Sequence, residues 1–428
     1  MMLTVLSSIF IFSILIGVPI AFGMGLAGVS WILFFEGLDA SILARRMYTA
    51  LSSFPLLAVP LFIMIGFLAD RSGMLPDLVR WLQLLLGRFK GGMAYINVVS
   101  SMVFAGVSGS AVSDVASLGR VEIEMMRQAG YPVPYSAALT AVSAIIAPII
   151  PPSVAMVIYA LAVGNISIGG LFMAGVVPGL LMGGGLLVIC WYKARAGVYG
   201  TMVDRPDLGT IVRQTVHVMP LILLPVLIVG GIVGGVFTVT ESAAIGVAYT
   251  LLIGFALTRQ LRLRDLYDAT VYSAVVSSVL GMLIGAGAIV SWILTRNQVT
   301  QQLADFVITV TTDPTLFLAA VAVALFLLGM VMDATAITIA LAPLLAPIAR
   351  LYGIDDLHFG MVFVLCTMIG LITPPVGIIL AITATVARIS FEAISRAIIP
   401  FVAWTIGVVA LIVLVPPLTL GLPRLLGF

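Results

Sequence analysis

The chain has 428 residues, of which 62% are hydrophobic and 9% are charged, and its mean hydropathy is +1.24. A soluble domain carries about a quarter charged residues, so this composition excludes an ordinary soluble enzyme and indicates an integral membrane protein built of helices. The net charge is only +2, and the basic residues lie in scattered short loops, so the sequence does not indicate nucleic-acid binding. Nucleotide-binding, catalytic-triad and metal-cluster motifs are missing from the sequence, so we expect neither enzymatic activity nor a cofactor.

The N-terminal part predicts scaffold helices and an amphipathic segment. Residues 3–35 are apolar for longer than the roughly 20 residues of one span. Gly17 and Pro19 lie in that stretch, so either one long bent helix or two short helices would fit. Residues 48–69 predict a clear span. Residues 75–90 place leucines and a tryptophan on one helical face, which indicates an interfacial amphipathic helix or a short span with charged ends.

Two interruptions of apolar sequence follow. Residues 93–128 carry so many small and polar residues at their centre that we expect a re-entrant helical hairpin with its tip at residues 108–110. Residues 136–163 contain Pro151-Pro152 and predict a helix split by the two prolines. A further span is expected at 170–192.

The rest of the chain alternates spans with basic loops and then shows the same interruptions again. Polar or basic connectors lie at 193–213 and 259–264. Spans are predicted at 217–236, 242–258, 270–294 and 398–418, a second hairpin at 316–349 and a second split helix at 360–386.

A shift of 223 residues brings the two sets of interruptions into register without a gap. It aligns Gly106 with Gly329, Gly130 with Gly353, Pro151-Pro152 with Pro374-Pro375, and Ile166-Ser167 with Ile389-Ser390. Interrupted hydrophobic segments at corresponding positions of two halves indicate the binding site of a secondary transporter.

Loop charge predicts opposite orientations for the two repeats. If the basic loops 193–213 and 259–264 are cytoplasmic, as the positive-inside rule favours, the first hairpin opens inward and residues 120–127 are cytoplasmic. The second hairpin then opens outward, with residues 350–357 on the periplasmic side. This inverted topology follows from charge alone and agrees with the repeat.

Broken helices expose groups that bind ions. The double prolines free backbone carbonyls within the membrane, and nearby hydroxyls add hard oxygen ligands suited to a small cation. The N-termini of half-helices favour an anionic substrate. The hydroxyls that could bind such a cation are those of Ser108, Ser110, Ser153 and Thr373. The alternative interpretation of each double proline is a kink that serves helix packing.

Asp114 and Asp333 are the acidic residues that the predicted hairpins place deepest. Under the repeat Asp114 corresponds to position 337, about one helical turn beyond Asp333. An ionisable group inside a membrane is costly and by default functional. The alternative is that each carboxylate caps a half-helix, and capping is compatible with building a site.

Four motifs resemble the signatures of one family. They are GVSGSAVSD at 106–114, IIPPS at 149–153, HFG at 358–360 and GLITPPVG at 370–377. In this order they resemble the large membrane subunit of tripartite ATP-independent periplasmic (TRAP) transporters, and the resemblance covers essentially the whole chain. Ser113 departs from the alanine that is more frequent there.

The resemblance implies an all-α polytopic membrane protein with the inverted-repeat, elevator-type fold, two re-entrant hairpins and two Pro-Pro-split helices. It implies sodium-coupled uptake of an organic acid across the bacterial inner membrane. The partners would be a periplasmic substrate-binding protein and a small four-helix membrane subunit, expected as a separate chain. The implied binding residues are Ser108, Gly109, Ser110, Asp114, Pro151, Pro152 and Ser153 at one site, and Gly329, Asp333, Thr335, Thr373, Pro374 and Pro375 at the other; the sodium ligands among them would be Ser108, Ser110, Asp114, Gly329, Asp333, Thr335 and Thr373.

The expected organisation has four parts: N-terminal scaffold and amphipathic arm (1–92), first transport repeat (93–192), connector with scaffold helices and second arm (193–315), and second transport repeat (316–428). Two other functions also fit the residues. A stand-alone ion or dicarboxylate symporter would need no binding protein, and a channel would use the helix breaks to line a pore.

Overall fold

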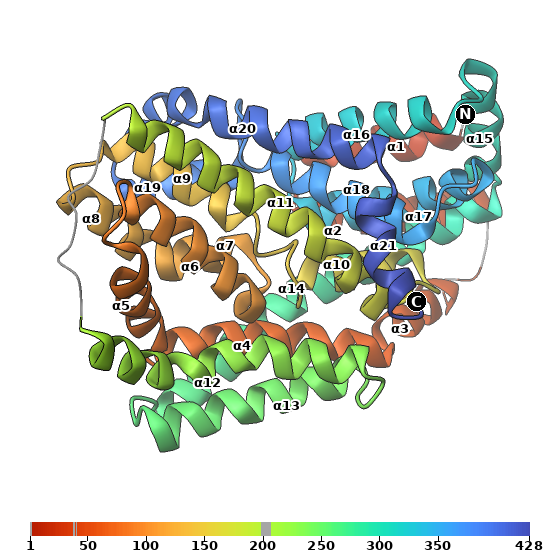
Figure 1. Ribbon diagram of the computed structural model, residues 1–428. Coiled ribbons are helices and arrows are strands. Elements are labelled where there is room, and N and C mark those ends of the chain that lie inside the picture. Colours follow the sequence, from red (N-terminus) through yellow and green to blue (C-terminus); the bar gives the residue numbers. More distant parts are fainter. Residues whose placement is uncertain (1, 37–38, 40, 198–206) are drawn as a thin grey trace.

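The computed structural model describes residues 2–36, 39, 41–197 and 207–428, and over these residues every regular element is a helix (Figure 1). Among them, seven helices are long and apolar enough to cross a membrane. An eighth span results if the pair α15 (Val299–Val310) and α16 (Pro314–Gly329), bent by 116°, is one span. The prediction of an all-α protein with several spans is therefore confirmed.

The long apolar N-terminal stretch forms two helices. α1 (Met2–Leu15) ends before Gly17, and α2 (Ile20–Trp31) begins after Pro19, which has no backbone N–H to continue a helix. α2 packs closely on α14 (Leu263–Arg296). A Cβ on Gly28 would lie 2.6 Å from the side chain of Ile289, so glycine permits this close approach.

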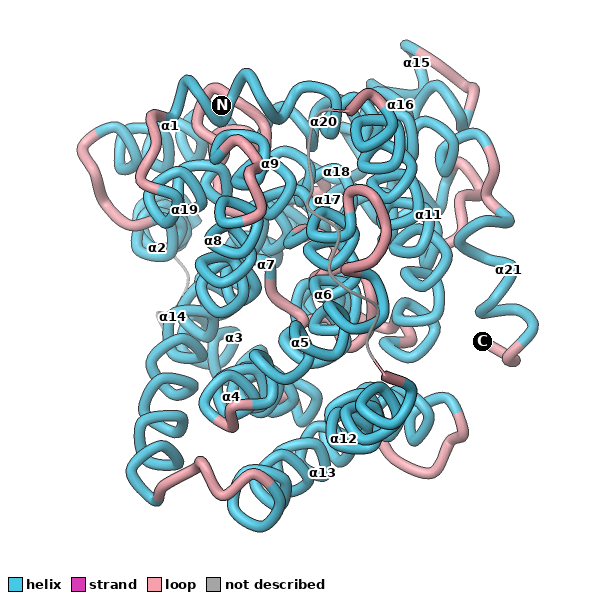
Figure 2. Tube along the Cα trace, turned by 60° about the vertical axis from the view of Figure 1, so that its left-hand side comes forward, coloured by secondary structure: helices cyan, strands magenta, loops and turns pink. Residues whose placement is uncertain are grey.

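A layer of helices from the first and middle parts of the chain borders the two repeats. α4 (Ala58–Arg71), α12 (Leu208–Val233) and α13 (Val239–Leu252) run side by side along one edge of the molecule (Figures 1 and 2). The amphipathic segment is α5 (Met74–Leu86), which packs against α6 (Gly92–Ser108) and α12. Its Trp81 Nε1 donates a hydrogen bond to Thr215 Oγ1 of α12 at 2.8 Å. From this layer, α4 contributes to the wall of the cavity described below.

The two repeats have the same order of elements. The first consists of α6 (Gly92–Ser108), α7 (Ala111–Asp114), the π-helical turn η3 (Val115–Gly119), α8 (Arg120–Gln128), α9 (Val133–Ala144), α10 (Val154–Val163) and α11 (Ile168–Arg195). The second consists of α16, α17 (Ala334–Leu351), α18 (Asp356–Gly370), α19 (Ile378–Ala387) and α20 (Phe391–Leu414). Helices separated by short breaks thus lie where both hairpins and both split helices were predicted, and that the hairpins are re-entrant stays a prediction. The remaining elements are α3 (Ser41–Leu51), η1 (Ile32–Glu36), η2 (Phe54–Leu57), η4 (Ile253–Leu257) and α21 (Pro417–Leu425).

The 223-residue offset holds in the structure at the level of single residues. The helices after the hairpin tips begin at Ala111 and Ala334, which are equivalent. Ser167 and Ser390, also equivalent, each cap the helix that follows the split one. The peptide bonds Pro151-Pro152 and Pro374-Pro375 are both cis. The sequence repeat therefore corresponds to a structural repeat.

The split helices of the two repeats contact each other at the centre of the apolar core. Tyr159 of α10 and Phe363 of α18 are both fully buried, with ring centroids 5.4 Å apart. A Cβ on Gly360 would lie 2.6 Å from the Tyr159 ring, so the glycine of the HFG motif allows α10 and α18 to approach. The split helices of the two repeats are therefore packed on each other.

Candidate functional site

The tip of the first hairpin packs directly on the break of its own split helix. α6 ends at Ser108, Gly109 adopts the left-handed conformation (φ 58°), and Ser110 Oγ accepts a hydrogen bond from the Ser113 amide at 3.5 Å. The Val154 amide donates to the Gly109 carbonyl at 3.4 Å. A Cβ at position 109 would lie 2.5 Å from the Pro152 carbonyl oxygen, so this tip requires glycine both for its backbone and for space.

The tip of the second hairpin makes the same kind of contact. α16 ends at Gly329, and the Gly377 amide, at the position equivalent to Val154, donates to the Met330 carbonyl at 3.1 Å. A Cβ on Gly370 would lie 2.5 Å from Gly329 Cα, so the two backbones touch. In each repeat, tip and break form one packed unit.

Asp333 caps the helix that follows the second tip. Its Oδ1 accepts hydrogen bonds from the amides of Thr335 at 2.8 Å and Ala336 at 3.4 Å. This cap is equivalent to Ser110 in the first repeat, so the structure pairs Asp333 with a serine and not with Asp114. The second tip therefore carries a negative charge where the first carries a neutral hydroxyl.

A cavity of about 340 Å³ lies between the two tips. Its lining includes Ser108, Gly109 and Ser110 from the first hairpin and Asp333 and Thr335 from the second. The opposite wall is formed by α4 and α14, with Ile63, Tyr272, Val276 and Leu280. Among the described residues that line this cavity there is no lysine or arginine, and Asp333 is the charged side chain.

The other predicted site residues do not line this cavity. Ser153 caps α10 by accepting from the Met156 amide at 3.2 Å, and its hydroxyl donates to the Pro148 carbonyl at 2.5 Å. Thr373 Oγ1 donates to the Ile369 carbonyl at 2.7 Å. Asp114 is 1% exposed, and its Oδ1 is buried without a hydrogen-bond partner among the described residues. The predicted residues that do not line the cavity are Asp114, Pro151, Pro152, Ser153, Gly329, Thr373, Pro374 and Pro375; their role as ion ligands stays a prediction.

Sequence reasoning missed one buried acidic residue in the first hairpin, Glu122 of α8, which is 0% exposed. The sequence around it, RVEIEMMR, resembles a solvated helix because three charged residues surround it. The feature of the sequence that could have revealed it is the helical spacing of Asn97 and Ser100 in α6, the helix that faces Glu122. Polar residues at that spacing form a stripe along an otherwise apolar helix and indicate a buried polar partner.

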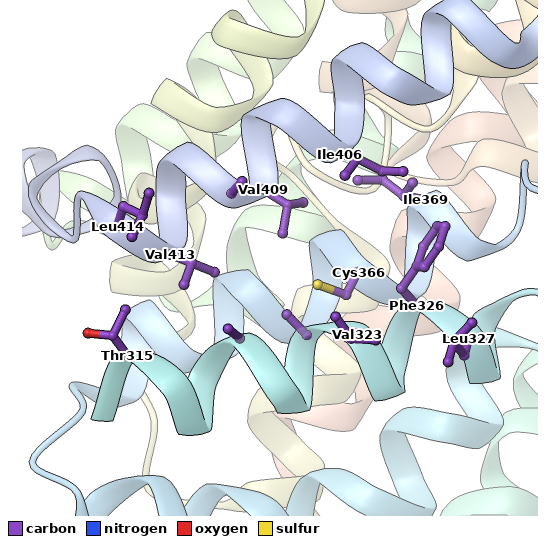
Figure 3. Close-up of a pocket in the computed structure, with 13 residues that line it drawn as sticks. Thr315, Val323, Phe326, Leu327, Cys366, Ile369, Ile406, Val409, Val413 and Leu414 are labelled. Atoms are coloured by element: carbon purple, nitrogen blue, oxygen red, sulfur yellow. The ribbon is translucent and has the colours of Figure 1, made fainter. Parts of the chain in front are cut away.

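A second cavity, of about 480 Å³, lies between α16, α18 and α20 (Figure 3). Phe326, Cys366 and Val409 are among its apolar lining residues, and the Thr315 hydroxyl is the polar side-chain group among the described residues around it. It offers no set of oxygen ligands, in contrast to the cavity between the hairpin tips.

Comparison with known proteins assigns the family. Residues 7–418 match the family described as "Tripartite ATP-independent periplasmic transporter, DctM component". The chain belongs to this family. It is therefore a multi-pass permease component of a transporter and not an enzyme, and the resemblance seen in its motifs is confirmed.

Relatives of known name support the assignment over the whole length. The chain is 33% identical over 413 residues to the sialic acid TRAP transporter large permease protein SiaM of Vibrio cholerae, covering 96% of each chain. It is 33% identical to the 2,3-diketo-L-gulonate TRAP transporter large permease protein YiaN of Escherichia coli, covering 95% of each. The crystal structure of the YdaH transporter of Alcanivorax borkumensis has a similar fold, with a TM-score of 0.64 at 16% identity, covering 88% of this chain and 89% of that one.

Proposed function

We propose that this protein carries an organic acid across the bacterial inner membrane together with sodium ions, which bind at the two hairpin tips. The observation that carries the proposal is the composition of the cavity between the tips. It contains a carboxylate, hydroxyls and the starts of two helices, but no basic side chain among its described lining residues. An anionic substrate placed there needs compensating cations, because an uncompensated charge in a low-dielectric site is costly.

The second tip has the better ligand set for sodium. Asp333 uses Oδ1 as a helix cap, and its Oδ2 makes no hydrogen bond within the described residues. Carboxylate, hydroxyl and backbone carbonyl oxygens are hard ligands that suit small cations. Thr335 and Thr373 supply the hydroxyls, and the backbone near Gly329 and Pro374-Pro375 supplies carbonyls. The first tip has the neutral counterparts, Ser108 and Ser110 with the carbonyls near Pro151-Pro152, and Asp114 behind them.

The mechanism that we infer is an elevator. Each hairpin tip is hydrogen-bonded to the break of its own split helix, and the two split helices pack on each other through Tyr159 and Phe363. These contacts favour movement of tips and breaks as one body. The wall formed by α4 and α14 would act as the stationary scaffold along which the cavity moves.

The substrate class and the partners follow from the family. SiaM and YiaN are named for sialic acid and 2,3-diketo-L-gulonate, and both of these compounds carry a carboxylate. The words "large permease protein" in both names imply a smaller companion, and the family name refers to a tripartite, periplasmic system. We therefore infer a separate small membrane subunit and a periplasmic substrate-binding protein that delivers the acid.

Uptake by proteoliposomes tests the proposal. The chain is reconstituted with its small subunit, and uptake of a radiolabelled acid is measured with and without sodium and with and without the binding protein. We expect uptake only when both are present. Uptake with sodium alone would identify a stand-alone symporter, and uptake that needs neither would identify a channel.

A further inference from the structure

Glu122 lies at the centre of a buried polar cluster between α6, α8 and α9. Its Oε1 is 2.6 Å from Ser100 Oγ, and its Oε2 accepts from Asn97 Nδ2 at 3.0 Å. The same Asn97 nitrogen donates to Thr140 Oγ1 at 2.6 Å, and Ser143 Oγ donates to Asn97 Oδ1 at 3.0 Å. All of these partners are neutral.

Among the described elements around this carboxyl group there is no basic side chain. The elements that pack against α8, namely α6, η3, α9 and α19, contain no lysine, arginine or histidine. On α8 itself, Arg127 pairs with Glu124 at 2.7 Å on the exposed side. An ionised Glu122 would therefore be a buried charge without a counter-charge, which is costly. The titratable or charged side chains on these elements, on α7 and on α8 are Tyr95, Tyr135, Asp114, Arg120, Glu124 and Arg127.

The contacts of Ser100 indicate where a proton lies. Its Oγ is 2.6 Å from the Ile96 carbonyl oxygen and 2.6 Å from Glu122 Oε1, but a hydroxyl has one proton. If Ser100 donates to Glu122, the contact with Ile96 brings two lone-pair-bearing oxygens together without a hydrogen. If Glu122 is protonated, it donates to Ser100, Ser100 donates to Ile96, and both short contacts are hydrogen bonds.

The same neighbours can also hold the ionised form. After loss of the proton, Glu122 can accept from the Ser100 hydroxyl and from the Asn97 amide without any change of backbone. Glu122 is fully buried, but its neighbours on α8, Val121 (42% exposed) and Arg120, lie at the surface of the molecule, so the helix that carries Glu122 borders that surface. A site that accommodates both forms and lies next to the surface can exchange a proton with water.

We propose that Glu122 is a buried proton-binding site that is protonated in this conformation and exchanges its proton with water during the transport cycle. The step is the making and breaking of one O–H bond, with water as the source and the acceptor of the proton. Within the described residues Glu122 makes no hydrogen bond to the sodium ligands proposed above, although Asp114, one of them, is near enough to interact with it electrostatically. In this proposal the proton is an ion that influences transport in addition to sodium.

Infrared spectroscopy of the purified protein in nanodiscs tests the proton directly and does not depend on the proposed function. We expect a protonated carboxylic acid band at neutral pH that shifts in D2O. Glu122→Gln should remove it, whereas Glu124→Gln, an exposed glutamate on the same helix, should leave it in place. Absence of a band that belongs to Glu122, or a band that does not shift in D2O, would overturn the proposal.

The pH dependence of transport gives the second test. If Glu122 must be protonated, uptake should fall by up to roughly tenfold per pH unit on the alkaline side of its titration. Glu122→Gln, which resembles the protonated form, should flatten that dependence and Glu124→Gln should not. A Glu122→Gln protein with the wild-type pH profile would refute exchange, and Glu122→Asp provides a titratable variant should the glutamine protein fail to fold.

Discussion

Ser110 and Asp333 occupy equivalent positions in the two repeats, and each caps the helix that follows the tip of its hairpin. Both residues also line the cavity between the tips. The two repeats therefore share a helix cap at this position, but the cap is a hydroxyl in the first repeat and a carboxylate in the second. This asymmetry gives the cavity one side that is neutral and one that is negative, which fits two cation sites of different strength.

The inverted topology predicts that equivalent positions in the two repeats face opposite sides of the membrane. Gln128 and Leu351 are 223 residues apart, end the second arms of the two hairpins, and are both exposed. We expect a membrane-impermeant thiol reagent to label Gln128→Cys from the cytoplasmic side and Leu351→Cys from the periplasmic side. The buried Cys190 and Cys366 would first be replaced. Labelling of both positions from the same side would rule out the inverted arrangement.

The contact between tip and break should not tolerate a methyl group. Gly109→Ala combines a left-handed backbone with a Cβ 2.5 Å from the Pro152 carbonyl, and we expect a loss of about 1–3 kcal/mol together with reduced uptake. Gly184→Ala is the control, because nothing lies within 4 Å of its Cβ position in α11. Thermal unfolding in detergent measures both proteins. Equal stability of the two variants would mean that tip and break are not packed as described.

The Thr373 hydroxyl is predicted to bind sodium, and α19 offers a matched control. Thr373 and Thr383 are both buried, and each donates its hydroxyl proton to the carbonyl four residues earlier at 2.7 Å. Thr373→Val should raise the sodium concentration for half-maximal uptake roughly fivefold, since one oxygen ligand is lost at a cost of about 1 kcal/mol. Thr383→Val should leave it unchanged. If the two variants behave alike, the Thr373 oxygen is not a ligand.

Much of the fold could be predicted because particular residue types interrupt its helices. Glycine and proline mark the tips and breaks, so the hairpin tip at 108–110 and both split helices were found at their observed places. The choice between one and two helices in residues 3–35 stayed open, because Gly17 and Pro19 also fit a bent helix. In the structure the stretch forms two helices, and the second of them, α2, packs on α14 at Gly28. This contact joins residues far apart in the sequence.

Less of the site could be predicted, because side-chain direction depends on tertiary contacts. Asp114 and Asp333 look alike in sequence, yet Asp333 lines the cavity and Asp114 is buried outside its lining. Glu122 was missed because exposed charges flank it on the same helix. Its burial depends on α6 and α9, whose polar faces become evident only when the three helices are together.

The apparent sodium affinity of uptake after Asp333→Asn tests the central claim most directly. Asp313 is a matched control, because its Oδ1 caps α16 by accepting from the amides of Thr315 at 2.7 Å and Leu316 at 3.3 Å, at the far end of the same hairpin. Asparagine caps a helix nearly as well as aspartate, so both variants should fold. We predict that Asp333→Asn lowers the apparent sodium affinity on the order of tenfold, about 1.4 kcal/mol, while Asp313→Asn keeps the wild-type curve. Wild-type sodium dependence in Asp333→Asn would contradict the account, because the carboxylate would then be a helix cap without an ion.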